Sequence, residues 1–460
     1  MAIKDLENYF SLNITDDDLF AYIMINEGEE EVRLIDIQKF LLKENVITGI
    51  QILNVKNFLK KGLYGEEFLI AKGYEPEEST PASLEYLVSD KVEQNLEEDE
   101  HGHIDFRDIQ IVNMIEKGTP LIRKHPMILG KNGLNVFNVE IPAEPAEDID
   151  LPMGENTVVS SEDEYLCISA CDGYIVKTND GKVHVNPTLK VKQDIDFSTG
   201  NIDFKGTVIV PGDLKSGFKI KASEDVIIHG AVENAEIESQ GNVMVKGGFI
   251  GLNEGLIFAK QDVRLSHVEN QKVYTEGNLY IKSELLNARV EAGNSILMEK
   301  GKIIGGRASA GSKIDVFDVG TKEGTYTEVV VGTNTFIIDK MKKVEQAIND
   351  LEKREAHIKE RIYELATKKV NGKEFTPEMA EELEKIKKEK NDIPGMIEQK
   401  RSEISLIKGD LDSLLDAKLT IRGVLYSNVK VTIGERNLLT KEDYRKCTLY
   451  LEDDQIRVQK

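Results

Sequence analysis

Three short stretches of the chain hold residue types that are capable of chemistry. His101 and His103 flank one glycine and could bind a metal ion, but they follow an acidic run and no third ligand stands at a useful spacing. We interpret the pair as part of a plain turn. The glycine-rich stretch 301–306 lacks the GxxxxGK[ST] order that cradles phosphate, so we interpret Gly305 and Gly306 as a corner of the chain.

Cys167 and Cys171 are four residues apart in a predicted strand. Four residues of strand cover about 13 Å, whereas a disulfide requires Cα atoms within about 7 Å of each other. The spacing therefore fits neither a disulfide, nor redox chemistry, nor a zinc site. We expect both thiols to pack against neighbouring side chains.

The composition limits the classes of partner. The 460 residues include 59 Lys and Arg against 82 Asp and Glu, a net charge of −23, which repels nucleic acid and anionic lipid surfaces. No apolar run approaches the ~20 residues that span a bilayer, and the first residues lack the pattern of a signal peptide. The three cysteines show no sign of a disulfide framework, so we expect a cytoplasmic protein. The charge and the lack of a long apolar run predict no nucleic-acid partner and no membrane insertion. We also expect no cofactor.

A self-similar phrase repeats along residues 200–316, and each copy joins a two-residue turn to an alternating strand. The turns begin at Gly200, Glu224, Gly241, Gln261, Gly277, Gly293 and Gly311, with spacings of 24, 17, 20, 16, 16 and 18 residues. The alternating pairs after them are Ile202/Phe204, Val226/Ile228, Val243/Val245, Val263/Leu265, Leu279/Ile281, Ile296/Met298 and Ile314/Val316. A second alternation precedes most turns, so each repeat holds at least two short strands.

A period near 17 residues indicates a solenoid, because one such unit cannot bury its apolar face alone. The phrase lacks the LxxLxL pattern of leucine-rich repeats, and the variable coil length favours a right-handed parallel β-helix over a left-handed hexapeptide helix. Seven coils would form a rod about 30–35 Å long. We expect the inward residues Ile228, Val245, Leu265 and Ile281 to stack in one column.

Residues 335–418 change to Glu, Lys, Ile and Leu in sustained heptads, which predict an antiparallel coiled-coil hairpin roughly 50–60 Å long. The first arm carries apolar residues from Met341 to Leu365, and Asn371-Gly372-Lys373 ends it. Pro394-Gly395 should kink or interrupt the second arm. Alternating strands resume at Val429, so the hairpin is an insertion in the rod.

The predicted fold class is mainly β: a right-handed parallel β-helix with an inserted antiparallel coiled-coil hairpin and an N-terminal α/β plus β-rich region. Residues 1–75 should form a small α/β unit, with strands at Phe20–Ile25 and Phe68–Ala71 and two helices between them. Residues 76–190 should form a β-rich region, with one helix around Ile109–Lys117. Residues 191–334 and 419–460 should form the β-helix and its C-terminal β-hairpin, which Asp453-Asp454 turns, and 335–418 the coiled-coil hairpin.

Five stretches carry a likeness to a known family: IDFRD at 104–108, LGKNGLNVFNVEI at 129–141, CDGYIV at 171–176, TGNIDFKGTVIVPGD at 199–213 and DVIIHGAVENAEIESQGNVMVKGGFIG at 225–251. The chain closely resembles the flagellar assembly protein A family from about Asp16 to its C-terminus. The resemblance implies a cytoplasmic bacterial protein with a β-rich N-terminal region, a right-handed parallel β-helix and a coiled-coil arm. It also implies a role in assembly or placement of the flagellum. Asn138 stands where the family usually has Gly, and the family has no catalytic residues to transfer.

These observations favour a non-enzymatic scaffold that binds other proteins. The partners would be flagellar assembly proteins or, as in one branch of the family, a sugar-phosphotransferase component; the coiled coil could also form a homo-oligomer. The alternative is a self-assembling filament similar to bactofilins. A carbohydrate-acting enzyme is a third hypothesis. Such an enzyme would need acidic side chains stacked on successive coils. The positions predicted to follow Asp203 are Ile227 and Met244, so the sequence predicts no such stack of acids. The predicted protein-binding residues lie at the hairpin tip: Asn371, Lys373, Glu374 and Phe375.

Overall fold

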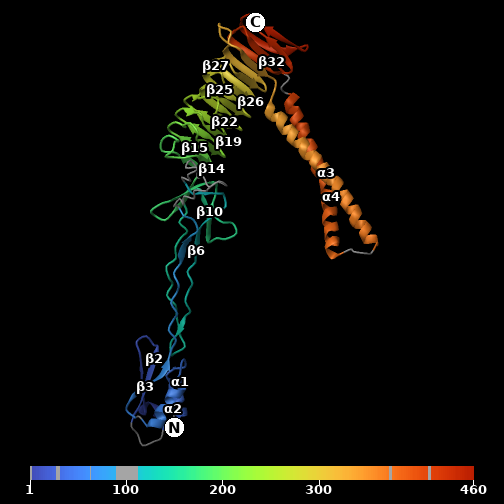
Figure 1. Cartoon of the computed structure of the whole chain (residues 1–460). Helices are drawn as coiled ribbons and strands as arrows, with labels where there is room; N and C mark the ends of the chain where they lie inside the picture. The colour runs from blue at the N-terminus through green and yellow to red at the C-terminus, as the bar shows by residue number, and fades with distance from the viewer. Residues whose placement is uncertain (1–2, 27–31, 63, 90–111, 372–375, 413–415) are drawn as a thin grey trace. The chain divides into compact units, whose positions relative to one another are not determined.

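A computed structural model of the chain describes every residue except 1–2, 27–31, 63, 90–111, 372–375 and 413–415 (Figure 1). The chain divides into two compact units. The first comprises Met1–Ser89, Lys117–Ala170 and Lys177–His184, and the second comprises Asp90–Glu116, Cys171–Val176 and Val185–Lys460.

The first unit begins with a three-stranded antiparallel sheet in the order β1-β2-β3, packed with two helices. Its elements are η1 (Ile3–Asn8), β1 (Phe10–Ile14), β2 (Phe20–Ile25), α1 (Leu34–Lys43), α2 (Ile52–Lys61) and β3 (Glu67–Lys72). The predicted strands and helices are confirmed, and β1 is an addition. Ile23, Ile37 and Phe40 form the core because their spacing places them on the inward faces.

The rest of the first unit is built of short strands. β4 (Ser83–Tyr86), β6 (Pro120–His125), β10 (Leu166–Ser169) and β9 (Thr157–Val159) form one sheet, and β7 (Gly133–Leu134) pairs with β8 (Glu140–Ile141). Val136, in the loop after β7, is fully buried in the core of the α/β part. The N–H groups of Ile47 and Thr48 donate to its carbonyl at 2.9 and 3.1 Å, so this loop closes the small core.

The prediction of a helix around Ile109–Lys117 is wrong for residues 112–117, the part that the structure describes. Residues 112–117 instead contain the strand β5 (Met114–Ile115), which pairs with β11 (Gly173–Lys177) through Gly173 and Tyr174. The strand β12 (Val183–Asn186) follows β11 along the chain. The pairing partner of β5 is nearly sixty residues away, so no local pattern could reveal it.

The second unit contains a parallel β-solenoid formed chiefly by two long sheets (Figure 1). Sheet 1 runs in parallel through β13 (Thr188–Lys190), β15 (Thr207–Val210), β17 (Val226–Ile228), β20 (Val243–Val245), β23 (Val263–Glu269), β25 (Leu279–Leu286), β27 (Ser295–Ile304), β29 (Lys313–Val319) and β31 (Lys418–Leu425), with β18 (Val232–Glu233) and β21 (Phe249–Ile250) beside it. Sheet 2 runs in parallel through β14 (Ile202–Phe204), β16 (Lys219–Ala222), β19 (Glu236–Ser239), β22 (Leu256–Ala259), β24 (Lys272–Thr275), β26 (Arg289–Ala292), β28 (Arg307–Ala310), β30 (Thr327–Val331) and β32 (Val429–Ile433).

The inward column of sheet 1 has the predicted register. Ile228 pairs with Val245, Val245 with Leu265 and Leu265 with Ile281, and none of the four is more than 4% exposed. The first repeat was misaligned, because Ile202 belongs to sheet 2, where it pairs with Ile220. The parallel stack also contains β13 before the first predicted repeat, and it continues through β31 and β32 after the arm.

Asn and Asp at the turns bind the neighbouring coil. Asp225 accepts hydrogen bonds from the backbone N–H of Asn242 at 2.7 Å and from its side-chain amide at 3.0 Å, and Asp262 holds Asn278 in the same way. Glycine precedes each of these Asn residues because a Cβ at Gly241 would lie 2.5 Å from a carboxylate oxygen of Asp225. The repeated turn phrase is therefore a polar ladder along the rod.

The inserted arm consists of α3 (Thr335–Asn371) and α4 (Pro377–Asp412). Val344, Ile358, Leu365, Leu383, Ile393, Ile397 and Ile407 are buried. Ion pairs joining Arg361 to Glu382 at 2.9 Å and Arg401 to Glu352 at 3.3 Å show that the helices are antiparallel neighbours. Figure 1 shows the two helices side by side.

The helix α4 continues through Pro394, so Pro394-Gly395 does not interrupt the second arm. Proline within a helix costs about 3 kcal/mol because it removes one hydrogen bond and crowds the preceding turn. Burial of the neighbouring Ile393 and of Ile397 against α3 offsets this cost. Gly395 has open space around it, which leaves room for the backbone to adjust.

Two antiparallel hairpins cover the C-terminal end of the solenoid. β34 (Tyr444–Glu452) pairs with β31 of sheet 1 and with β35 (Gln455–Gln459), and β33 (Arg436–Leu439) pairs with β32 of sheet 2. Asp453 and Asp454 turn the last hairpin with φ of 51° and 61°, which confirms the predicted turn.

Candidate interaction site

The predicted tip of the arm lies mostly outside the described residues. Asn371 is the last residue of α3, whereas Lys373, Glu374 and Phe375 fall in the stretch 372–375 that the structure does not describe. The tip therefore stays a prediction.

Large apolar side chains are exposed on the described part of the arm. Tyr363 is 75% exposed and Val370 is 85% exposed, and their spacing of seven places both on one face of α3. Leu406 on α4 is 74% exposed. Sequence reasoning missed them because it followed only the heptad core; the signal was an apolar residue outside the 3-4 spacing.

The start of α3 is tied to the solenoid. The side-chain amide of Asn334 donates to the carbonyl of Gly293 at 2.7 Å, and its oxygen accepts the N–H of Ile337 at 3.1 Å, which caps the helix. The hydroxyl of Thr335 donates to Glu291 on β26. Asn334 is 4% exposed, so this anchor is shielded from water.

The two roots of the arm lie close together. A Cβ added at Gly332 would lie 3.2 Å from the Cβ of Ala417, and the N–H of Lys418 donates to the carbonyl of Ser312 at 3.2 Å. The insertion thus leaves and re-enters the solenoid at neighbouring points. The expected proximity of the two roots is confirmed.

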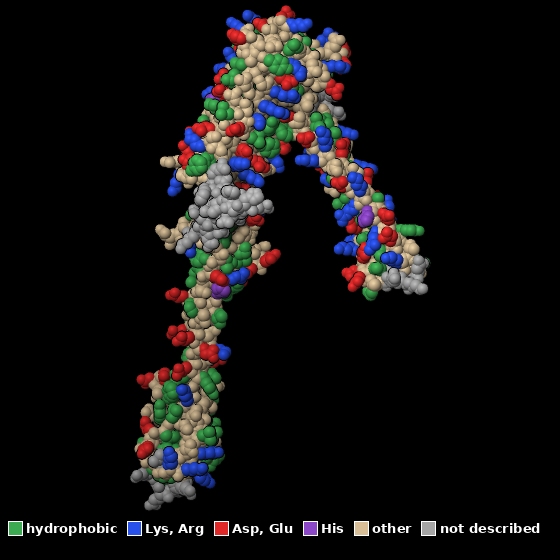
Figure 2. Space-filling model, viewed as in Figure 1, with side chains coloured by type: hydrophobic (Ala, Val, Ile, Leu, Met, Phe, Trp, Pro, Cys, Tyr) green, Lys and Arg blue, Asp and Glu red, His purple; other side chains and the backbone are tan. Residues whose placement is uncertain are grey.

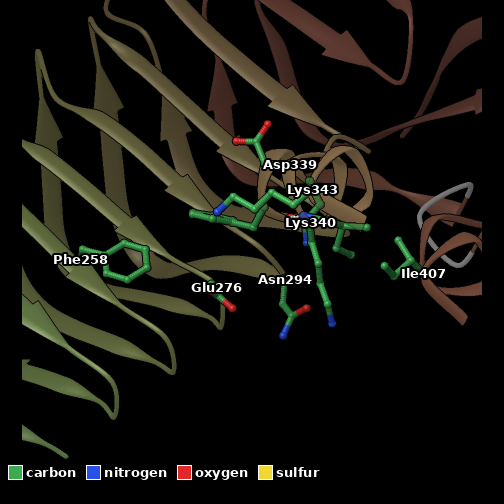
Figure 3. A pocket seen from close by; sticks show the side chains of 10 residues that line it. Phe258, Glu276, Asn294, Asp339, Lys340, Lys343 and Ile407 are labelled. Carbon is green, nitrogen blue, oxygen red and sulfur yellow. Dashed lines mark hydrogen bonds between the residues drawn. The ribbon is translucent and has the colours of Figure 1, made fainter. Parts of the chain in front are cut away.

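A cleft, which we call the root cleft, lies between sheet 2 and the start of the arm (Figure 3). It is lined by Phe258, Glu276, Asn294, Asn334, Phe336, Ile337, Asp339, Lys340, Lys343 and Ile407. The rings of Phe258 and Phe336 are 6.4 Å apart between centroids and supply its apolar wall. Lys340 and Lys343 on α3 are exposed and form no ion pair within the described residues. The cleft can therefore hold a ligand with both apolar and charged parts.

None of the three cysteines is among the residues that line the root cleft. Cys167 on β10 is fully buried, and burial raises the pKa of its thiol although a hydrogen bond with Thr157 opposes the shift. Cys171 lies in a turn rather than in the predicted strand. All three cysteines are free thiols.

The other chemical candidates are also accounted for. Gly305 and Gly306, both with φ of +67°, form the corner between β27 and β28, as expected. His101 and His103 lie outside the described residues. Across the described ranges, no group of three or more His, Cys, Asp or Glu side chains is placed to hold a metal ion.

The residues stacked beside Asp203 differ from those predicted. Asp203 pairs with Lys221, and Lys221 with Glu238, because its strand belongs to sheet 2. The outward acid Asp315 lies on sheet 1 instead, where Arg422 binds it at 2.7 and 3.0 Å and Lys313 at 2.7 Å. Arg422 holds the pKa of Asp315 below its usual range, and Lys313 adds to the effect against the opposing influence of burial.

Comparison with known families matches both parts of the chain. The Flagellar Assembly Protein A beta solenoid domain matches residues 187–456, and the Flagellar Assembly Protein A N-terminal region matches residues 10–180. The chain belongs to the flagellar assembly protein A family. The solenoid match spans the arm as well as the coils on both sides of it. Neither the curated proteins nor the solved structures contain a match.

Within the flagellar assembly protein A N-terminal region, Asn138 has φ of 62°, a left-handed conformation that glycine adopts freely and Asn tolerates. Asn138 therefore allows the same turn that a glycine would form. The carbonyl oxygen of its side chain accepts a hydrogen bond from Thr48 at 3.1 Å. No helix in the described ranges is long and apolar enough to cross a membrane.

Proposed function

We propose that the protein is a non-enzymatic cytoplasmic scaffold that binds other proteins during assembly or placement of the bacterial flagellum. Membership of the flagellar assembly protein A family supports the flagellar part of this proposal. The partners are flagellar assembly proteins or sugar-phosphotransferase components.

The exposed face of α3 is the surface that binds the partner protein. Tyr363 and Val370 expose most of their apolar surface to water, and covering that surface with a partner is favourable by about 25 cal/mol per Å². Asn334 ties the base of the same helix to the solenoid, so an arm of roughly 50 Å presents this face from a fixed base.

The double variant Tyr363→Ser, Val370→Ser tests this function in motile cells that express the tagged full chain. We expect partner recovery to fall by about tenfold or more, because aromatic anchors such as Tyr are enriched among the few residues that dominate binding. Swimming motility should fall with it, while circular dichroism stays unchanged. A matched control, Ile250→Ser with Leu252→Ser, removes exposed apolar residues from the solenoid and should retain binding.

Unchanged motility and partner recovery in the Tyr363, Val370 double variant would contradict the proposal. The proposal would also be contradicted if the double variant sedimented as a smaller species but still recovered every other protein partner. The exposed face of α3 would then join copies of this chain.

A further inference from the structure

Three cations lie side by side on the outer surface of sheet 2. Lys272 on β24 pairs with Arg289 on β26, and Arg289 pairs with Arg307 on β28. We call this row the basic ladder. Adjacent strands are about 4.8 Å apart, so the row brings like charges into register on neighbouring strands, which is unfavourable.

At the equivalent positions of other coils, the positive charges are paired with carboxylates. Lys219 forms an ion pair with Glu236 on the next coil at 2.8 Å. At the other end Glu328 binds Arg307 at 3.4 Å and Lys430 at 2.9 Å. In contrast, neither Lys272 nor Arg289 has an ion-pair partner among the described residues. The central coils therefore carry positive charge that the fold itself does not use.

Aromatic side chains flank the basic ladder. Phe258 and Tyr274 pair on β22 and β24, and both are half-buried. Tyr274 is two residues from Lys272, which places the two side chains on the same face. Phe258 also lines the root cleft, so the aromatic row connects the basic ladder to Lys340 and Lys343. Figure 2 shows Lys and Arg side chains beside apolar ones on the solenoid near the start of the arm.

This surface also contains acids. Glu276 and Asp339 line the root cleft, and Glu291 accepts the hydroxyl hydrogen of Thr335. The basic ladder is therefore a small positively charged area on a chain whose net charge is −23. Such a chain repels a long polyanion, but screening over about 8 Å at physiological salt lets a short acidic segment respond to the local charge.

We propose that the basic ladder, the aromatic row and the root cleft together bind an acidic peptide segment of a partner protein. Carboxylates of the segment pair with Lys272 and Arg289, and an aromatic or aliphatic side chain packs against Phe258 and Phe336. This inference rests on the proposed scaffold function and names the chemistry of one partner segment. Pairing of these two cations with carboxylates relieves the like-charge contact in the free protein.

The probe is a fluorescein-labelled dodecapeptide that repeats Glu-Phe-Glu-Gly three times, and fluorescence anisotropy of the full chain measures its affinity. Replacing every Glu by Gln, or every Phe by Gly, should weaken binding by about tenfold or more. Affinity should also fall as salt rises. Inorganic polyphosphate should not compete at equal charge; full competition would show a general anion site and overturn the proposal.

The variant Lys272→Gln, Arg289→Gln removes the unpaired charges and should reduce affinity by about tenfold or more. The matched control Lys219→Gln, Lys221→Gln removes the same charge from the same sheet and should bind within about twofold of wild type, because surface charges act over short distances. Equal binding by both variants, or no binding of the acidic peptide by the wild type, would overturn the inference. Circular dichroism checks the fold of each variant.

Partner recovery from cells separates this inference from the proposed function. If the basic-ladder variant keeps its partners and motility while Tyr363→Ser, Val370→Ser loses them, the acidic site is wrong and the scaffold function stands. If neither variant changes partner recovery or motility, the scaffold function fails as well.

Discussion

Single inward residues control the stability of the solenoid, because its core is narrow and each coil depends on its neighbours. Ile228 is fully buried and stacks on Val245 of the next coil. Asp315 lies on the outer face of sheet 1, where it binds two cations and is only 5% exposed. The residue scale therefore offers one apolar test and one electrostatic test.

The variant Ile228→Asp should destabilise the rod by several kcal/mol, since it places a charge in the core without a partner. Thermal unfolding followed by circular dichroism measures the change. The exposed neighbour provides the control: Met244→Asp should change the free energy of unfolding by less than about 0.5 kcal/mol. A cooperative melt of Ile228→Asp at the wild-type temperature would contradict the stacked register.

The variant Asp315→Asn should lower the free energy of unfolding at neutral pH by about 1–3 kcal/mol, because it weakens the bonds to Arg422 and Lys313. The pKa of Asp315 is lowered by folding, so its carboxylate stabilises the fold above the unfolded pKa. This contribution disappears as pH falls through the lowered pKa. The gap between wild type and variant should therefore close below about pH 4. A gap that is constant with pH in urea titrations would exclude this role.

Among the elements, the arm combines an internal core with a fixed root. Its helices bury apolar residues against each other and are joined by ion pairs such as that of Arg361 with Glu382. Asn334 and Ala417 mark its two attachments, which the solenoid brings together. This arrangement predicts that the arm and the solenoid fold separately.

Replacement of residues 338–411 by a short Gly-Ser linker tests the independence of the arm. This deletion keeps Asn334, Phe336 and Ala417, so the root contacts that pack on the solenoid remain. Circular dichroism should lose helix and keep strand, and the solenoid should still unfold cooperatively. Motility should fail, because the face carrying Tyr363 is gone. A shortened chain with normal motility and unchanged oligomeric state would show that the arm is dispensable.

Considering the whole solenoid unit, the hairpins at its C-terminal end decide how copies of the chain can meet. β34 and β33 pair with the last parallel strands of the two sheets, so these strands are not available for a further parallel coil from another copy. Bactofilin-like stacking through this end would have to displace them. The caps therefore support the scaffold proposal over the filament.

Sedimentation of the purified chain at micromolar concentration separates these assemblies. We expect a small species whose size is constant over a tenfold range of concentration, since capped edges do not propagate. A variant truncated before Arg436 exposes the last coil and should aggregate or elongate. Growth of the wild type into long polymers under the same conditions would favour the filament and contradict the scaffold proposal.

The sequence by itself determined the repeating β coils, the heptad arm and most inward positions, because periodicities of 2, 3.5 and about 17 residues are local properties of the chain. The column from Ile228 to Ile281 and the paired roots of the arm were predictable on this basis. So was the family resemblance, which rests on continuous motifs.

Only the tertiary structure decided which strands and loops outside this column are neighbours. Ile202 joined sheet 2 because corner lengths set strand register, and Val136 closed a core formed by residues far from it in the sequence. Pro394 remained helical because packing against α3 outweighed its local preference. Likewise, Lys272 and Arg289 are 17 residues apart in the chain, and only parallel pairing of β24 with β26 places their charges side by side.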